Sequence, residues 1–168
     1  GFIPHGLNLL LKASSSDLII RIDAHSYIDR DYIQKIYECM SIYPKSFISG
    51  KLITIPSNNS LIAKGICEAQ SSAFGSGPGS EFRYSKNKKI YEVSSSAFCG
   101  MKREDLNKIG FYDENFIGSE DDELNFRASK KGIQILVNSD TRVYYHSREN
   151  FYTFFIQYFN YGYFKYGF

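Results

Sequence analysis

The fold prediction starts from the stretch Asp17-Leu-Ile-Ile-Arg-Ile-Asp23-Ala-His25. Its run of β-branched apolar residues, with an acid at each end, predicts a buried strand over residues 17–23. An imidazole follows two positions after the second acid. In open α/β sheets, ligands bind beyond the carboxyl ends of the strands. Asp23 and His25 therefore lie where a bound group is expected.

The remainder of the chain alternates between helical and strand patterns. Apolar spacing and capping residues predict three helices over residues 7–13, 103–109 and 119–131. A further helix, capped by Asp29 or Asp31 and stopped by Pro44, is expected to bury Tyr32, Ile33, Ile36, Tyr37 and Met40. Strands or extended segments are predicted over residues 46–55, 91–101, 133–137 and 142–146, with a turn over 56–60 and a mobile surface loop over 71–80. This order of elements predicts an α/β fold.

Composition excludes several classes of protein. The 168 residues suit one domain, and a formal net charge of +2 is too small for a dedicated nucleic-acid binder. Three widely spaced cysteines predict neither a disulfide framework nor a zinc site, and favour a reducing, cytoplasmic compartment. The first residues carry no signal-peptide pattern, and their entry directly into a helix leads us to expect a truncated N-terminus.

Aromatic residues gather at the C-terminal end. Of the 28 Phe and Tyr residues, 11 lie within residues 151–168. This segment is too short and too polar to span a bilayer, so we predict a helix that either packs on the domain or lies at a membrane surface. We therefore divide the chain into a domain over residues 1–150 and an aromatic helix over 151–168.

Two constellations carry candidate chemistry. Asp23 and His25 offer the oxygen and nitrogen ligands that suit Mg²⁺ or Mn²⁺, although Asp23 could equally cap a turn beside a surface histidine. Glu120-Asp121-Asp122-Glu123 begins a helix, where one or two acids are explained by the helix dipole. Four adjacent carboxylates repel each other, and this repulsion favours a general base among them. His146 ends a strand, where a lone histidine is more often structural.

Six segments, taken in order, resemble the family 2 glycosyltransferases with a GT-A fold, and among them the bacterial succinoglycan and exopolysaccharide glucosyltransferases. The segments are Gly6–Asp17, Ile20–His25, Phe74–Gly77 with Phe82–Tyr84, Cys99–Glu104 with Ile109–Glu114, Glu120–Arg127, and Tyr145–Arg148 with Gln157–Gly162. The chain departs from the family at Cys99, where glycine is usual near the expected acceptor side. The resemblance implies a Rossmann-like mixed sheet flanked by helices, without the first nucleotide-binding β-α unit.

The resemblance also implies an activity: inverting transfer of a sugar from a nucleotide diphosphate sugar, expected to be a UDP-hexose. The acceptor is a hydroxyl of a saccharide or lipid-linked molecule in exopolysaccharide synthesis, at the inner face of the cytoplasmic membrane. Two alternatives stay open from the residues. One is a sugar-phosphate nucleotidyltransferase, and the other is a non-catalytic, truncated binding module.

Roles follow residue by residue from the same resemblance. Asp121 is the expected base, and Glu120 orients it or raises its pKa. Asp23 and Arg21 are expected to contact the bound donor, while Asp23, His25 and His146 are the expected ligands of Mg²⁺ or Mn²⁺. Arg127 is expected to anchor its helix through an ion pair.

Overall fold

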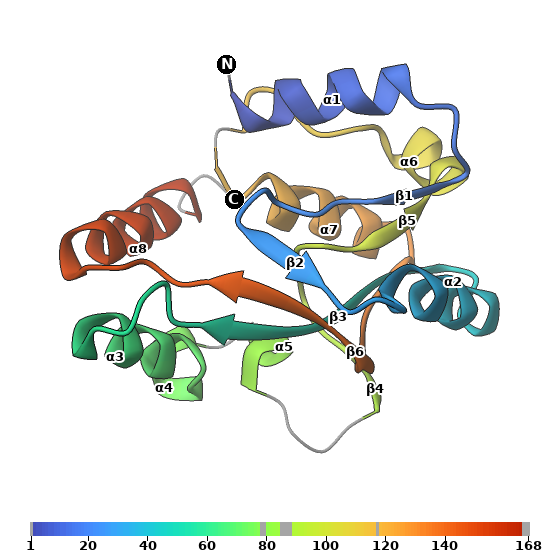
Figure 1. Cartoon of the computed structure of the whole chain (residues 1–168). Helices are drawn as coiled ribbons and strands as arrows, with labels where there is room; N and C mark the ends of the chain where they lie inside the picture. The colour runs from blue at the N-terminus through green and yellow to red at the C-terminus, as the bar shows by residue number, and fades with distance from the viewer. Residues whose placement is uncertain (1, 78–79, 85–88, 117, 166–168) are drawn as a thin grey trace.

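The structure, a computed structural model, describes residues 2–77, 80–84, 89–116 and 118–165 and has an α/β architecture (Figure 1). Its strands are β1 (Leu18–Ile20), β2 (Ser26–Ile28), β3 (Ser46–Ile55), β4 (Ile90–Glu92), β5 (Gly100–Lys102) and β6 (Gln134–His146). Its helices are α1 (Ile3–Ala13), α2 (Tyr32–Ile42), α3 (Leu61–Gln70), α4 (Ala73–Ser76), α5 (Glu81–Tyr84), α6 (Arg103–Ile109), α7 (Glu120–Lys130) and α8 (Phe151–Lys165).

One mixed sheet organises the described residues. The strand order is β1-β5-β3-β6-β2, and β4 also pairs with β6. The long central strands β3 and β6 run parallel, whereas the other pairs are antiparallel. Because alternate side chains of a strand point to opposite faces, Phe47 packs into a core with α1, α6 and α7, and Ile48 packs into a second core with α2. The mixed sheet between helical layers confirms the predicted fold class.

Several predicted elements are confirmed with close bounds. The strand over residues 46–55 and the helix over 103–109 have the predicted limits. Gly110 closes that helix with φ of 87°, a conformation that glycine adopts without strain. Helix α1 ends at Ala13, before the serine run, and α7 begins at Glu120 in the acidic segment.

Other predictions need correction. The predicted strand over residues 17–23 is regular only over Leu18–Ile20 and half-buried, because it pairs with β5 alone among the described strands. Helix α2 buries Tyr32, Ile36, Cys39 and Met40, whereas Ile33 and Tyr37 are exposed because they lie outside the stripe that faces the sheet. Its N-cap, Asp31, makes no side-chain cap bond and instead pairs with Lys35 at 2.8 Å.

Tertiary pairing also changes the predicted strands and loops. The two strands predicted over 133–137 and 142–146 form one strand, β6, since β3 pairs with both halves. The expected break survives as a shift of register, in which Gly50 pairs with Asn138 and Lys51 with Arg142. Extended structure over 91–101 is limited to the end of β4 and the start of β5. Helix α3 was not predicted, and the segment predicted as a loop over 71–80 contains α4, with residues 78 and 79 outside the described residues.

The C-terminal helix is confirmed as α8, up to Lys165, and residues 166–168 lie outside the described residues. It lies beside α3 and α4 at one end of β3 and β6 (Figure 1). Gln157 is buried and donates a hydrogen bond to the hydroxyl of Tyr145 at 2.9 Å, so one face of the helix packs on the domain. The opposite face exposes Phe151, Tyr152, Phe155, Phe159 and Tyr163. None of the helices in the described ranges is long and apolar enough to cross a membrane.

Candidate active site

Arg21 is the cation at the centre of the site. It directly follows β1, and its side chain is only 12 % exposed. Its Nε donates to Asp23 Oδ1 at 2.9 Å, and its Nη1 lies 2.8 Å from Glu120 Oε1 in an ion pair without hydrogen-bond alignment. Burial opposes the charge of Arg21, but Asp23, Asp121 and Glu120 together raise its pKa above the ordinary value. Arg21 thus joins the end of β1 to the start of α7.

Asp121 is the perturbed acid of the site. Burial raises the pKa of its carboxyl to about 6, with repulsion from Asp122 and Glu120 adding to the rise and attraction to Arg21 opposing it. The backbone N–H of Asp122 donates to Asp121 Oδ1 at 3.1 Å. A carboxyl with a pKa near neutral accepts a proton well at physiological pH, as a general base must.

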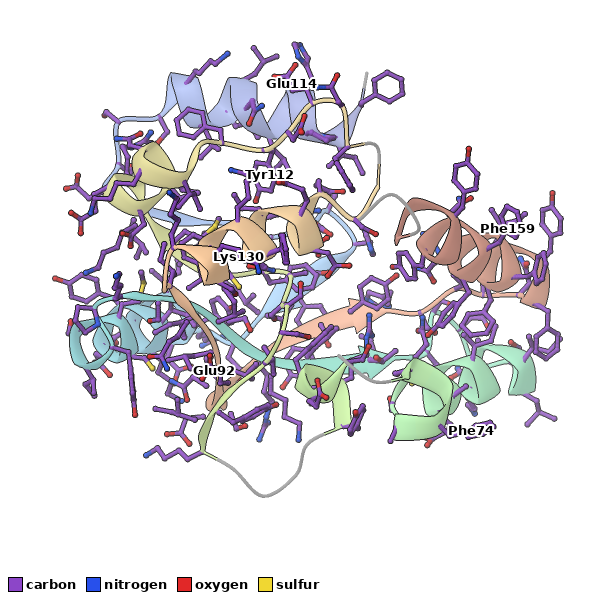
Figure 2. All side chains as sticks on the ribbon, turned by 180° about the vertical axis from the view of Figure 1, so that it is seen from behind. Phe74, Glu92, Tyr112, Glu114, Lys130 and Phe159 are labelled. Atoms are coloured by element: carbon purple, nitrogen blue, oxygen red, sulfur yellow. The ribbon has the colours of Figure 1, made fainter. Side chains whose placement is uncertain are left out.

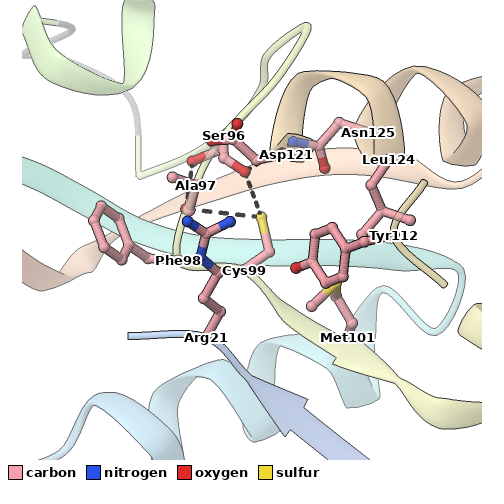
Figure 3. Close-up of a pocket in the computed structure, with 10 residues that line it drawn as sticks. All are labelled: Arg21, Ser96, Ala97, Phe98, Cys99, Met101, Tyr112, Asp121, Leu124 and Asn125. Atoms are coloured by element: carbon pink, nitrogen blue, oxygen red, sulfur yellow. Dashed lines mark hydrogen bonds between the residues drawn. The ribbon is translucent and has the colours of Figure 1, made fainter. Parts of the chain in front are cut away.

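A small pocket brings these groups together (Figure 3). Arg21 enters it from the end of β1, Asp121 from the first turn of α7, and Tyr112 from the segment before α7. The remaining lining residues are Ser96, Ala97, Phe98, Cys99, Met101, Leu124 and Asn125. Burial raises the pKa of Cys99 to about 12, so the thiol remains neutral and is unsuited to act as a nucleophile.

Asn125 forms hydrogen bonds along a polar part of the pocket wall. Its Nδ2 donates to Ser95 Oγ and to the carbonyl of Ser96, each at 2.9 Å. Ser96 Oγ lies 2.7 Å from Ser49 Oγ on β3. Helical spacing indicates Asn125, because it lies four residues after Asp121 and therefore on the same helix face. Nothing local marks Ser96 or Tyr112, since long-range packing brings them to the pocket.

The predicted histidine ligands have neighbouring backbones but different ring partners. The N–H of His146 donates to the carbonyl of His25 at 3.4 Å. The His25 ring packs against Tyr145, at 4.9 Å between ring centroids, whereas the His146 ring lies 6.1 Å from that of Tyr27, which stacks on Tyr144.

Asp23, in turn, is engaged by Arg21. Among the residues that the structure describes, no three His, Cys, Asp or Glu side chains lie close enough to hold one metal ion. As arranged, Asp23, His25 and His146 do not fit a three-ligand site.

Arg127 is predicted to anchor its helix through an ion pair. Arg127 forms a two-pronged ion pair with Glu123, including an Nη2–Oε2 distance of 2.7 Å. It also donates to the carbonyls of Ile109 and Phe111 at 2.6 and 2.7 Å. The predicted ion pair is present but lies within α7, and the hydrogen bonds to the carbonyls of Ile109 and Phe111 are the contacts that anchor the helix.

The α/β fold thus carries a perturbed acid and a buried arginine beyond a strand end, and comparison with known proteins identifies the family. Residues 4–110 match Glycosyl transferase family 2, and the chain belongs to this family. It is 32 % identical over 149 residues to the succinoglycan biosynthesis protein ExoA of Rhizobium meliloti (strain 1021). That match covers 89 % of this chain but 44 % of the relative, so the chain spans under half the length of the curated relative.

Solved structures agree on the fold. GalNAc-T7, solved with UDP, GalNAc and Mn²⁺, superposes with a TM-score of 0.66 and 16 % identity, over 88 % of this chain and 31 % of that chain. S. aureus TarS residues 1–349, solved in complex with UDP, superposes with a TM-score of 0.57 and 16 % identity, over 83 % of this chain and 38 % of that chain. The GT-A fold predicted from the sequence is therefore confirmed.

Proposed function

We propose that this chain carries the base-bearing part of an inverting glycosyltransferase that moves a hexose from a UDP-sugar to a hydroxyl of a saccharide or lipid-linked acceptor in exopolysaccharide synthesis. The observation that carries the proposal is Asp121. It is a carboxyl with a pKa of about 6 in a pocket that also holds a buried arginine.

Asp121 performs the proton transfer in this mechanism. The acceptor oxygen attacks the anomeric carbon, the bond from that carbon to the diphosphate oxygen breaks, and its electron pair leaves with the nucleotide diphosphate. Asp121 takes the proton of the attacking hydroxyl, which such a positioned base accelerates by about 10²- to 10⁴-fold. Attack from the face opposite the leaving group inverts the anomeric configuration.

Arg21 and Glu120 prepare that base. The cationic Arg21 favours the ionised form of Asp121, which is the form able to accept the proton, while Glu120 holds Arg21 beside the pocket. Arg21 and Asp23 are also the residues we propose to lie nearest the donor diphosphate. A divalent cation in the complete enzyme would supply charge neutralisation at the leaving group. Asp23 and His25 are the ligands to test, and no step above depends on them.

The base assignment is tested by Asp121→Asn, with Asp122→Asn as its neighbouring control. We expect Asp121→Asn to keep its affinity for UDP, measured by calorimetry, and to lose at least about 100-fold in UDP release from UDP-hexoses with lipid-linked saccharide acceptors. Asp122→Asn removes a carboxylate that does not line the pocket and should retain transfer, with its pH profile moved to lower pH because the repulsion that helps to raise the pKa of Asp121 is lost. Near-normal transfer by Asp121→Asn removes Asp121 from the role.

The metal is tested separately. We expect UDP to bind more tightly with Mn²⁺ than with a chelator, and we expect Asp23→Ala to abolish this difference. Equal titrations of the unaltered chain in the two conditions would exclude a metal contribution from these residues.

Helix α8 is the proposed contact with the cytoplasmic face of a membrane. Its exposed aromatic side chains and its lack of Asp or Glu suit the interface between lipid head groups and acyl chains. Phe155 and Phe159 are 64 % and 60 % exposed. We expect the Phe155→Ser, Phe159→Ser variant to lose co-sedimentation with phosphatidylglycerol vesicles, whereas Phe74→Ser, at an exposed site on α4, should retain it. Equal sedimentation of both variants contradicts the assignment. The division at residue 150 remains part of this proposal.

A further inference from the structure

A buried asparagine on α1, Asn8, forms hydrogen bonds with the backbone of Tyr112, which lines the pocket. Asn8 Nδ2 donates to the carbonyl of Tyr112 at 2.8 Å, and the N–H of Tyr112 donates to Asn8 Oδ1 at 3.0 Å. Asn8 is 6 % exposed, and its Nδ2 also donates to Glu114 Oε1 at 2.9 Å. His5 Nδ1 lies within hydrogen-bonding distance of the other carboxylate oxygen of Glu114, Oε2, at 2.9 Å. Both hydrogen-bonding groups of the Tyr112 backbone are thus fixed by one carboxamide.

These hydrogen bonds fix the backbone of Tyr112, whose side chain points into the pocket. Figure 2 shows Tyr112 between α1 and α7, and Figure 3 shows its ring in the wall of the pocket with Arg21 and Asp121. Tyr112 is 6 % exposed and lines the same small pocket as Arg21. Burial raises its pKa to about 12, so the phenol stays neutral.

The hydroxyl needs an explanation beyond packing. Phenylalanine would fill the same space without burying a polar group, and a buried hydroxyl costs free energy unless it is hydrogen-bonded. Arg21, for its part, has five N–H donors, of which Nε is taken by Asp23, and its buried Nη1 lacks an aligned acceptor. The phenol oxygen of Tyr112, in the same pocket, is the kind of acceptor that this guanidinium can use.

We propose that Tyr112 is a positioning residue whose hydroxyl holds the Arg21 guanidinium beside Asp121, and that Asn8 sets Tyr112 in place from α1. The proposal rests on the proposed function, because it assigns Tyr112 an effect on transfer through Arg21 and Asp121. It also gives α1 a part in the site, although α1 contributes no residue to the pocket lining.

The hydroxyl is tested by Tyr112→Phe, with Tyr91→Phe as the matched control. Tyr91 is 7 % exposed, donates to the carbonyl of Glu81, and does not line the pocket. We expect Tyr112→Phe to lower kcat for UDP-sugar transfer by between about tenfold and 100-fold, with KM for the donor nearly unchanged, since a misplaced group costs that much. Tyr91→Phe should leave both constants unchanged.

Asn8 is tested through its dependence on Tyr112. Asn8→Ala should lower kcat in the natural background and add little to Tyr112→Phe, because both act through one hydroxyl. It should also raise hydrogen exchange at the Tyr112 amide by at least about 100-fold, since that N–H loses its acceptor. Asn138→Ala is the control, because Asn138 is equally buried, 6 % exposed, and accepts from the backbone N–H of Asp140.

The outcomes separate the two proposals. If the complete enzyme that contains this chain transfers sugar and its Asp121→Asn variant does not, a normal kcat in Tyr112→Phe overturns the positioning role alone. Additive losses for Asn8→Ala and Tyr112→Phe, or unchanged exchange at the Tyr112 amide, overturn the part given to Asn8. If the complete enzyme releases no UDP, the proposed function and the positioning role both fail.

Discussion

Asp121 should destabilise the folded protein above neutral pH, and its replacement by asparagine should reveal by how much. The folded carboxyl has a pKa of about 6, against 3.8 for the ordinary group. Between these two pH values the folded state holds a proton that the unfolded state has lost. Stability is therefore fully present below pH 4 and falls as the pH rises through 6. The cost at pH 8 is about two pH units at about 1.4 kcal/mol each, or about 3 kcal/mol as an upper bound.

Asparagine has no such cost because it does not ionise. We expect the free energy of unfolding of Asp121→Asn, relative to the natural chain, to be up to about 3 kcal/mol larger at pH 8 than at pH 4. Urea unfolding followed by circular dichroism gives the stability difference between the variant and the natural chain at each pH. Subtracting the value at pH 4 from the value at pH 8 removes the effect of packing changes, which is the same at both pH values. Asp17→Asn, at an exposed position, controls for loss of a surface charge and should shift by less than about 0.5 kcal/mol. A difference of zero, or one in which Asp121 is the more stabilising residue at pH 8, refutes the raised pKa of the Asp121 carboxyl.

Two stability predictions follow from buried polar contacts. Tyr32→Phe should cost about 2 to 3 kcal/mol in urea unfolding, because the Tyr32 hydroxyl donates to the carbonyl of Phe98 at 2.8 Å and accepts from the N–H of Gly50 at 3.0 Å. Phe98 has φ of 61°, and a cost below about 0.5 kcal/mol means that this strained residue is held by other contacts. Arg127→Met should cost about 2 to 4 kcal/mol because it leaves Glu123 unpaired, and adding Glu123→Met should recover part of the loss. A double variant less stable than Arg127→Met contradicts this account.

Local pattern was sufficient for the elements whose burial follows from their own sequence. The strand over residues 46–55 carries apolar residues at five of its ten positions and is followed by Pro56, and the helix over 103–109 is closed by Gly110. Local pattern was insufficient where contact with a neighbouring element determines which residues are buried or where a strand ends. Ile33 and Tyr37 fit a helical stripe by spacing, yet only the position of α2 on the sheet determines which stripe is buried. The two strand patterns within residues 133–146 form one strand because β3 continues past the irregularity between them.

The order of short motifs along the chain is enough to indicate the class of protein and the residue types that carry its proposed chemistry, because that order does not depend on folding. Asp121 and Arg21 are both visible in it, as are Asp23 and the two histidines. Which of these side chains meet depends on how the elements pack. Arg21 and Asp121 share a pocket because α7 begins beside the end of β1, while the rings of His25 and His146 contact different tyrosines although their backbones are hydrogen-bonded. The pKa of Asp121 is likewise a tertiary quantity, since burial and neighbouring charges from several elements set it.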